Sequence, residues 1–115
     1  MKHRGKGRIF GRKYGQRKAL MKSLASSFFM LGKIKTTEAK AKEVRPRIEK
    51  WITRAKKPTL ANRRILRATF SNDVTKKIID HAVVHATRPG GHTRITKLVR
   101  RPGDAAKMAI IELVK

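Results

Sequence analysis

Residues 33–55, KIKTTEAKAKEVRPRIEKWITRA, join a short β-branched segment to a long amphipathic one. The β-branched segment, residues 33–37, predicts an edge strand. Thr37 has a side chain suited to a helix N-cap and Glu38 suits a first turn, so we expect a helix through the rest of the quoted stretch. Pro46 lies inside that helix, but the apolar spacing keeps its phase across it, which predicts a kink and not a break. The apolar stripe consists of Ala41, Val44, Ile48, Trp51, Ile52 and Ala55.

Three further segments have helical spacing. Residues 16–31 end before Gly32, which suits a C-terminal stop. Residues 58–70 open with a proline suited to a first helical turn. Residues 72–84 begin with Asn72 as the expected N-cap. The side chains expected to face the core are Leu20, Met21, Leu24, Ala25, Phe28 and Leu31, then Leu60, Ala61, Ile65 and Ala68, and then Val74, Ile78 and Ala82. Trp51 lies on an apolar stripe, so we expect it in the core and not stacked on a base.

The C-terminal part predicts strands over residues 93–99 and 107–114. Between them the order Pro then Gly in residues 101–104, RPGD, suits the central positions of a type II turn. The last strand is apolar on both faces, so we expect it to be central. With no internal repeat, the expected fold class is α+β, with about four helices packed on a small three-stranded mixed sheet. We expect residues 16–115 to form a single α+β domain and residues 1–15 a basic, extended RNA-binding arm.

Charge is the strongest compositional signal. The 115 residues include 31 Lys and Arg against 7 Asp and Glu, a formal net charge of +24. The first acid is Glu38, so the preceding residues carry positive charge unopposed. The first fifteen residues are also rich in glycine, and a segment of that composition cannot bury enough apolar surface to order itself. The charge therefore predicts a polyanionic partner, usually a nucleic acid.

Three other binding partners or destinations compete with RNA. An acid-poor, basic N-terminus is typical of organelle transit peptides, but glycines interrupt residues 1–15 where a transit peptide needs a helix. Basic amphipathic helices also bind anionic membranes, but here the positive charge continues through every later segment. No apolar run is long enough to span a membrane, and we expect no membrane partner. A nucleoid-type DNA-binding protein remains the alternative.

Catalytic motifs are scarce. The chain has no Cys, which excludes thiol catalysis and thiolate zinc sites. His81 and His85 are spaced to share a metal on a helix, but no suitable acid stands between them and no third ligand is apparent. The chain has no phosphate-binding glycine motif of a nucleotide hydrolase. We therefore expect no enzyme, no cofactor, no metal and no small-molecule substrate.

A flexible basic arm suits irregularly folded RNA, on which Tyr14 can stack against an unpaired base. Gly90 and Gly91 can bring backbone amides close to phosphate, and Arg88 and Arg94 flank them. The residues expected to bind RNA are Lys2, His3, Arg4, Lys6, Arg8, Arg12, Lys13, Tyr14, Arg17, Lys18, Lys22, Arg63, Arg64, Arg88, Gly90, Gly91 and Arg94.

Seven segments resemble one family in order along the chain. They are MKHR (1–4), QRKAL (16–20), IKTT (34–37), AKAKE (39–43), ANRR (61–64), GGHTRI (90–95) and GDAAKMAIIELV (103–114). In these segments the sequence resembles the bacterial large-subunit ribosomal protein L17 family. Departures include Gln16, where the family usually has His, and His92, where it usually has Tyr.

This resemblance implies a cytoplasmic protein of the large ribosomal subunit with no catalysis of its own. It implies binding to large-subunit ribosomal RNA near the nascent-chain exit region, and contact with a neighbouring large-subunit ribosomal protein. Because the family pattern begins at Met1, we expect the basic arm to belong to the mature protein and not to a transit peptide.

Overall fold

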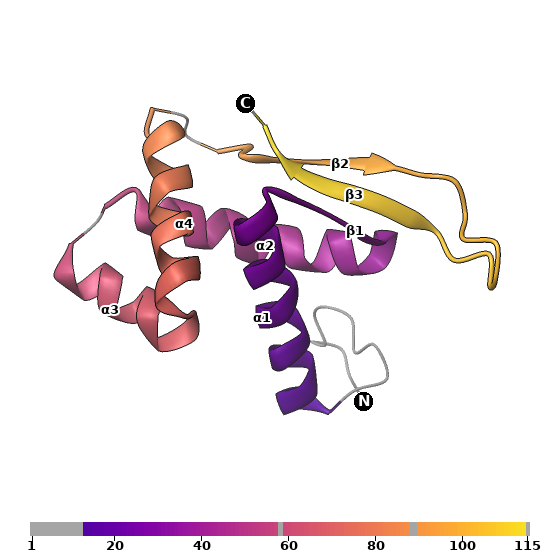
Figure 1. The fold of residues 1–115 in the computed structure, drawn as a ribbon, viewed down its shortest axis with the longest axis horizontal. Coiled ribbons are helices and arrows are strands. Elements are labelled where there is room, and N and C mark those ends of the chain that lie inside the picture. The colour runs from indigo at the N-terminus through magenta and orange to yellow at the C-terminus, as the bar shows by residue number, and fades with distance from the viewer. Residues whose placement is uncertain (1–12, 58, 88–89, 115) are drawn as a thin grey trace, which may run out of the picture.

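The computed structural model describes residues 13–57, 59–87 and 90–114. These residues form four helices and three strands (Figure 1). Their order is α1 (Tyr14–Leu31), β1 (Lys33–Thr37), α2 (Glu38–Ala55), α3 (Leu60–Thr69), α4 (Asn72–Val84), β2 (Thr93–Lys97) and β3 (Met108–Leu113). The α+β class is confirmed. No helix among the described residues is long and apolar enough to cross a membrane.

The sheet has the order β1-β3-β2, which confirms the last strand as the central one and residues 33–37 as an edge strand. Ile111 of β3 lies opposite Ile34 on one side and Ile95 on the other. The expected mixed sheet is wrong, because β3 pairs antiparallel with both neighbours. The two strands that run in the same direction, β1 and β2, occupy opposite edges and never pair.

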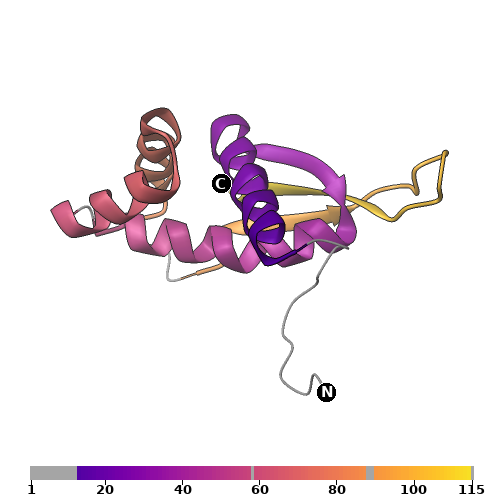
Figure 2. The same cartoon turned by 90° about the horizontal axis from the view of Figure 1, so that it is seen from below.

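Helix α2 contacts every other helix and all three strands. Figure 2 shows it running along the sheet, with α1 crossing it and α3 and α4 near its C-terminal end. Val44, Ile48 and Ile52 are fully buried, as the stripe in residues 33–55 predicts. Thr37 caps the helix as expected, since its Oγ1 accepts a hydrogen bond from the Lys40 N–H at 3.4 Å. The helix is continuous through Pro46, so the predicted absence of a break is confirmed.

Helix α1 begins at Tyr14, two residues before the expected start, and buries a different face from the predicted one. Met21, Ala25, Phe28 and Phe29 are buried, whereas Leu31 is 73% exposed. Successive helical residues are about 100° apart, and the buried face lies roughly one such step from the predicted stripe. The sequence offers two overlapping apolar stripes here, and packing against α2 and α4 selects one of them.

Helix α3 contradicts the expected inward face. Leu60 is 66% exposed and Ile65 is 40% exposed, and Leu66 is the residue that α3 buries. This ten-residue helix contacts the rest of the structure through α2 and α4, so a narrow side of it is covered. The predicted inward side, which also includes Ala61 and Ala68, is left exposed.

Helix α4 buries Val74, Ile78 and Ala82, as predicted. Its N-cap, however, is Ser71 and not Asn72: the Ser71 Oγ accepts from the Val74 N–H at 3.4 Å. Asn72 is the first helical residue, so the capping side chain lies one position earlier than expected.

The turn between β2 and β3 is not type II. Gly103 does not have the positive φ that this turn requires at its third residue; Ala105 has φ 55° instead. The Ala105 N–H donates to the Arg101 carbonyl at 2.8 Å, and the Arg101 and Asp104 side chains form an ion pair at 2.7 Å. These contacts close a turn one residue longer than predicted, and both flanking strands are shorter than expected.

Candidate nucleic-acid interface

The exposed side of α1 carries the N-terminal cations that the structure describes. Lys13, Lys18 and Lys22 are exposed, and the Arg17 guanidinium carbon lies 5.9 Å from the centre of the Tyr14 ring. Tyr14 itself is 71% exposed. The first turn is closed by the Gln16 side chain, whose Oε1 accepts from the Lys13 N–H at 3.3 Å. The helix thus holds five expected RNA contacts on a rigid support.

Two of these cations join α2 and the end of α3 in a small hollow, the α1–α2 crevice. Its lining consists of Lys18, Met21, Lys22, Ala25, Arg47, Trp51, Thr69 and Phe70. Lys18, Lys22 and Arg47 are exposed, and the lining includes no acid. Trp51 is half-buried and packs against the hydrophobic core, so its predicted core role is confirmed, although part of the side chain lines the crevice.

Sequence reasoning missed the cations of α2. Arg47, Lys50 and Arg54 are exposed, and so is Lys57 just beyond the helix end. Their successive spacings of three, four and three residues place them along one side of a helix. That periodicity was visible in the sequence, but the apolar stripe of the same segment dominated its interpretation.

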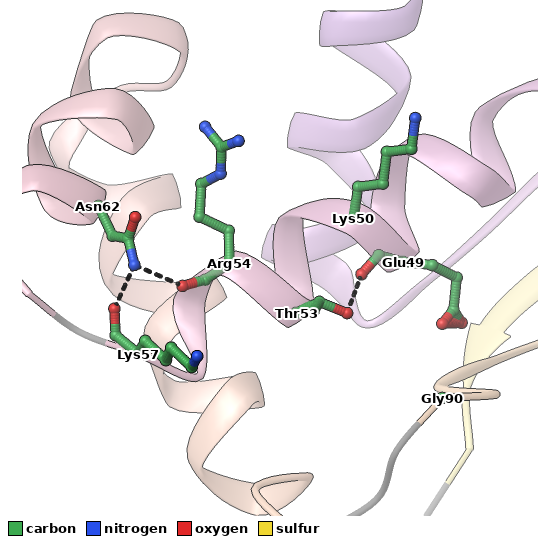
Figure 3. Close-up of a pocket in the computed structure, with 7 residues that line it drawn as sticks. All are labelled: Glu49, Lys50, Thr53, Arg54, Lys57, Asn62 and Gly90. Carbon is green, nitrogen blue, oxygen red and sulfur yellow. Dashed lines mark hydrogen bonds between the residues drawn. The ribbon is translucent and has the colours of Figure 1, made fainter.

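A second hollow lies on another side of α2, with a volume of about 520 Å³ and a lining that includes Glu49, Lys57, Asn62 and Gly90. Figure 3 shows the Asn62 amide joining two segments: its Nδ2 donates to the Lys57 carbonyl at 2.6 Å and to the Arg54 carbonyl at 3.3 Å. Asn62 therefore ties α3 to the C-terminal end of α2, which gives the asparagine beside Arg63 a structural role.

Glu49 fixes the segment that follows the glycine pair. In Figure 3 its carboxylate points toward the side where Gly90 lies, while Lys50 and Arg54 extend the other way. The carboxylate accepts from the His92 N–H at 3.1 Å, and from the Thr93 N–H and hydroxyl at 2.8 and 3.0 Å. These two amides, the nearest described ones after Gly91, thus already bind an anionic group of the protein. A phosphate at this loop would have to approach a carboxylate.

Arg94 also has an internal partner. Its Nη2 lies 2.8 Å from the Glu112 Oε1 and its Nε 3.2 Å from the same oxygen. The Arg94 side chain is 63% exposed, so phosphate can still reach it.

The other ion pairs of the described residues also lie at the sheet. Glu38, at the start of α2, is 2.8 Å from Lys42 and 3.7 Å from Lys97. Hydrogen bonding to Lys42 lowers the pKa of the Glu38 carboxyl, and the charges of Lys97 and Lys107 act in the same direction. Together with Arg94–Glu112 and Arg101–Asp104, these pairs neutralise cations near β2 and β3.

The remaining expected site residues are separated or fall outside the described segments. Arg63 and Arg64 are exposed on α3, away from the α1–α2 crevice lining. The expected contacts outside the described residues are Lys2, His3, Arg4, Lys6, Arg8, Arg12 and Arg88.

The two histidines considered as metal ligands have packing roles. The His81 Nε2 lies 3.1 Å from the Phe29 carbonyl, and its ring stacks on the Phe29 ring. His85 is buried edge-to-face against His92, with ring centres 5.2 Å apart. Within residues 13–57, 59–87 and 90–114, no three His, Cys, Asp or Glu side chains are grouped to hold a metal ion.

Comparison with known proteins identifies close relatives of this chain. A family model described as "Ribosomal protein L17" matches residues 20–114. The large ribosomal subunit protein bL17 of Mycoplasmopsis agalactiae is 50% identical, in an alignment that covers 92% of this chain and 95% of the relative. The bL17 proteins of Bdellovibrio bacteriovorus and Gemmatimonas aurantiaca are each 46% identical. Those alignments cover 97% of this chain and 63% of the Bdellovibrio protein, and 99% of this chain and 98% of the Gemmatimonas protein.

Proposed function

Because this chain belongs to the ribosomal protein L17 family, a structural and non-enzymatic family of the large ribosomal subunit, we propose that it binds ribosomal RNA through its basic arm and basic helix faces. The observation that carries this proposal is the α1–α2 crevice, where three exposed cations meet without an acid. Cations placed this way repel one another unless a polyanion neutralises them. Phosphate contacts would position the protein, and the shape of the folded RNA would supply specificity.

The phosphate contacts proposed first are Lys18 and Lys22, together with the arm residues Lys2, Arg4, Lys6, Arg8, Arg12 and Lys13 and with Arg17. His3 and Tyr14 are proposed RNA contacts of the same region. Arg63, Arg64, Arg88, Gly90, Gly91 and Arg94 form a second group. Within that group, Glu49 and Glu112 compete with phosphate at the glycine loop and at Arg94.

The division of the chain into an arm, residues 1–15, and a domain, residues 16–115, belongs to the same proposal. Helix α1 already includes Tyr14 and Gly15, so the rigid support begins two residues before that boundary. We expect limited proteolysis to cut the free protein before Gln16 and to spare this segment in the assembled subunit. Equal protection in both states would mean that the arm folds onto its own domain.

Neighbouring ribosomal proteins are proposed as further partners. Leu60 of α3 and Val84 of α4 are 66% and 75% exposed. Apolar side chains that stay exposed in an isolated domain are suited to an interface with another protein. We expect crosslinks from α3 or α4 to reach a large-subunit protein, and crosslinks to RNA alone would contradict this role for the two helices.

The salt dependence of RNA binding tests the electrostatic account. With about eight phosphate contacts, the logarithm of the affinity for large-subunit ribosomal RNA should fall with the logarithm of the salt concentration with a slope near −6. A slope near zero would contradict phosphate contacts as the basis of binding. In cell extracts the protein should sediment with large subunits after salt washing, whereas a nucleoid-type protein would sediment with DNA.

A further inference from the structure

We propose that the α1–α2 crevice holds one unpaired nucleotide of an RNA, with the phosphate on Lys18, Lys22 and Arg47 and the base against Trp51. This inference rests on the proposed function, and it assigns a ligand to a hollow that packing of the core does not require. It also gives Trp51 a second role beside its contact with the core.

The size of the hollow limits what it can hold. Its volume is about 130 Å³. A water molecule takes up about 30 Å³ of the liquid, and pockets that enclose whole drug-sized ligands measure roughly 300–1,000 Å³. The crevice is therefore too large to be a packing defect filled by one water and too small for a complete cofactor. One base or one sugar fits this range, with the rest of the strand outside.

The lining separates into a charged part and an apolar part. Lys18 and Lys22 are one helical turn apart on α1, and Arg47 faces the same hollow from α2. Met21, Ala25 and Phe70 are buried side chains of the core that line its apolar part. Ammonium and guanidinium groups bind phosphate through charge-assisted hydrogen bonds, and an apolar wall accommodates a base. A nucleotide has both chemistries at this scale, whereas a metal ion or an apolar peptide matches one part alone.

The indole of Trp51 is held in place before any ligand binds. Its ring centre lies 5.1 Å from that of Phe70, with the planes at 80°, and the Arg54 guanidinium carbon is 5.6 Å from the Trp51 ring centre. An aromatic side chain fixed in this way contacts a base without losing further rotational freedom. An unpaired base can enter the crevice, but a base stacked and paired inside a duplex cannot reach it.

The chain offers a direct reporter, because Trp51 is its single tryptophan. We would titrate the full-length protein with single-stranded poly(A), with a poly(A)·poly(U) duplex and with poly-glutamate. Tryptophan emission reports on the crevice, and anisotropy of end-labelled probe reports on binding anywhere. We expect poly(A) to change the emission saturably. The duplex should raise the anisotropy and leave the emission unchanged, and poly-glutamate should leave the emission unchanged.

Matched variants then test the residues. Lys22→Gln and Arg47→Gln retain Trp51 and should weaken the poly(A)-dependent emission change several-fold more than Lys76→Gln, the same loss of charge at an exposed position of α4. Trp51→Leu should reduce poly(A) affinity roughly 5- to 150-fold, as loss of base contacts with an aromatic side chain does, and should leave duplex affinity unchanged. Circular dichroism would verify that each variant is folded.

Several results would overturn the inference. If poly(A) raises the anisotropy without changing the emission, the crevice is not a nucleotide site, although the proposed function stands. An equal emission change with poly-glutamate or with the duplex would reduce the crevice to a general anion site. If neither RNA binds, the proposed function itself fails, and the nucleotide site fails with it.

Discussion

The sheet and the α1–α2 crevice use the same residue types in opposite ways. At the sheet, Arg94 is paired with Glu112 and Arg101 with Asp104. In the crevice, none of Lys18, Lys22 and Arg47 forms an ion pair within the part of the chain that the structure describes. Of the few acids in this chain, the sheet region holds most of those with a visible partner. Paired cations support the fold locally, whereas unpaired cations need a partner from outside.

The largest expected effect concerns Glu49, which ties β2 to α2. Glu49→Ala removes an acceptor from two backbone amides and one hydroxyl, so we expect the free energy of unfolding to fall by about 2–4 kcal/mol. Urea denaturation followed by circular dichroism measures this change. Lys50→Ala, at the next position of α2 and exposed, is the matched control and should stay within about 0.5 kcal/mol of the parent. Equal stability of the two variants would contradict the role of Glu49.

Neutralising the crevice should have the reverse profile. The triple variant Lys18→Gln, Lys22→Gln and Arg47→Gln removes three proposed phosphate contacts, which should make the salt slope of RNA binding less steep by about 2. Its free energy of unfolding should not decrease, because no ion pair is lost and like charges are removed. Filter binding at several salt concentrations and urea denaturation provide the two measurements. An unchanged slope would move the RNA interface away from the crevice.

A smaller effect is expected at the exposed pair of the sheet. Arg94→Gln should lower the free energy of unfolding by no more than about 1 kcal/mol, since the Arg94 and Glu112 side chains are 63% and 27% exposed. Thermal denaturation at low and high salt measures it, and added salt should shrink the difference from the parent. A loss comparable to that of Glu49→Ala would mean that surface pairing supports the sheet more than the Glu49 contacts do.

The smallest expected effect is local and depends on pH. The hydrogen bond from Arg101, helped by the Ala106 N–H, lowers the pKa of Asp104 from 3.8 to about 2. Because the folded-state pKa is the lower one, the pair stabilises the turn above about pH 3.8 and loses this effect as the pH falls toward 2. NMR titration of the Asp104 carboxyl should show the low midpoint, and Arg101→Gln should raise the midpoint toward 3.8. An unchanged midpoint would leave the arginine without influence on Asp104.

The elements that were predicted well are those whose signal is local. Thr37 is a cap because its own side chain reaches an amide three residues on, and α4 buries Val74 and Ile78 because it offers a single apolar stripe. Helices α1 and α3 each offer more than one candidate stripe. The choice between Leu31 and Phe29, or between Ile65 and Leu66, depends on the surface that the neighbouring helices leave uncovered.

The candidate site was predictable in part for the same reason. The cations of α1 were visible from composition and spacing, and so, in principle, was the basic stripe of α2 that contains Arg47. The crevice was not visible, because it arises where Lys18 and Trp51, from different helices, meet Phe70 at the end of α3. The role of Glu49 was equally hidden, since its contact with Thr93 joins residues 44 positions apart.

Charge, helical period and capping chemistry follow from neighbouring residues, so the chain alone establishes a basic α+β protein with α2 as its central helix and suggests the family to which it belongs. Strand order, the buried faces of α1 and α3 and the sorting of cations into paired and unpaired sets required the tertiary structure. Each of these depends on contacts between segments far apart in the chain, and many such contacts are compatible with the same local pattern. Folding selects the arrangement that buries the apolar faces together and leaves the unpaired cations exposed.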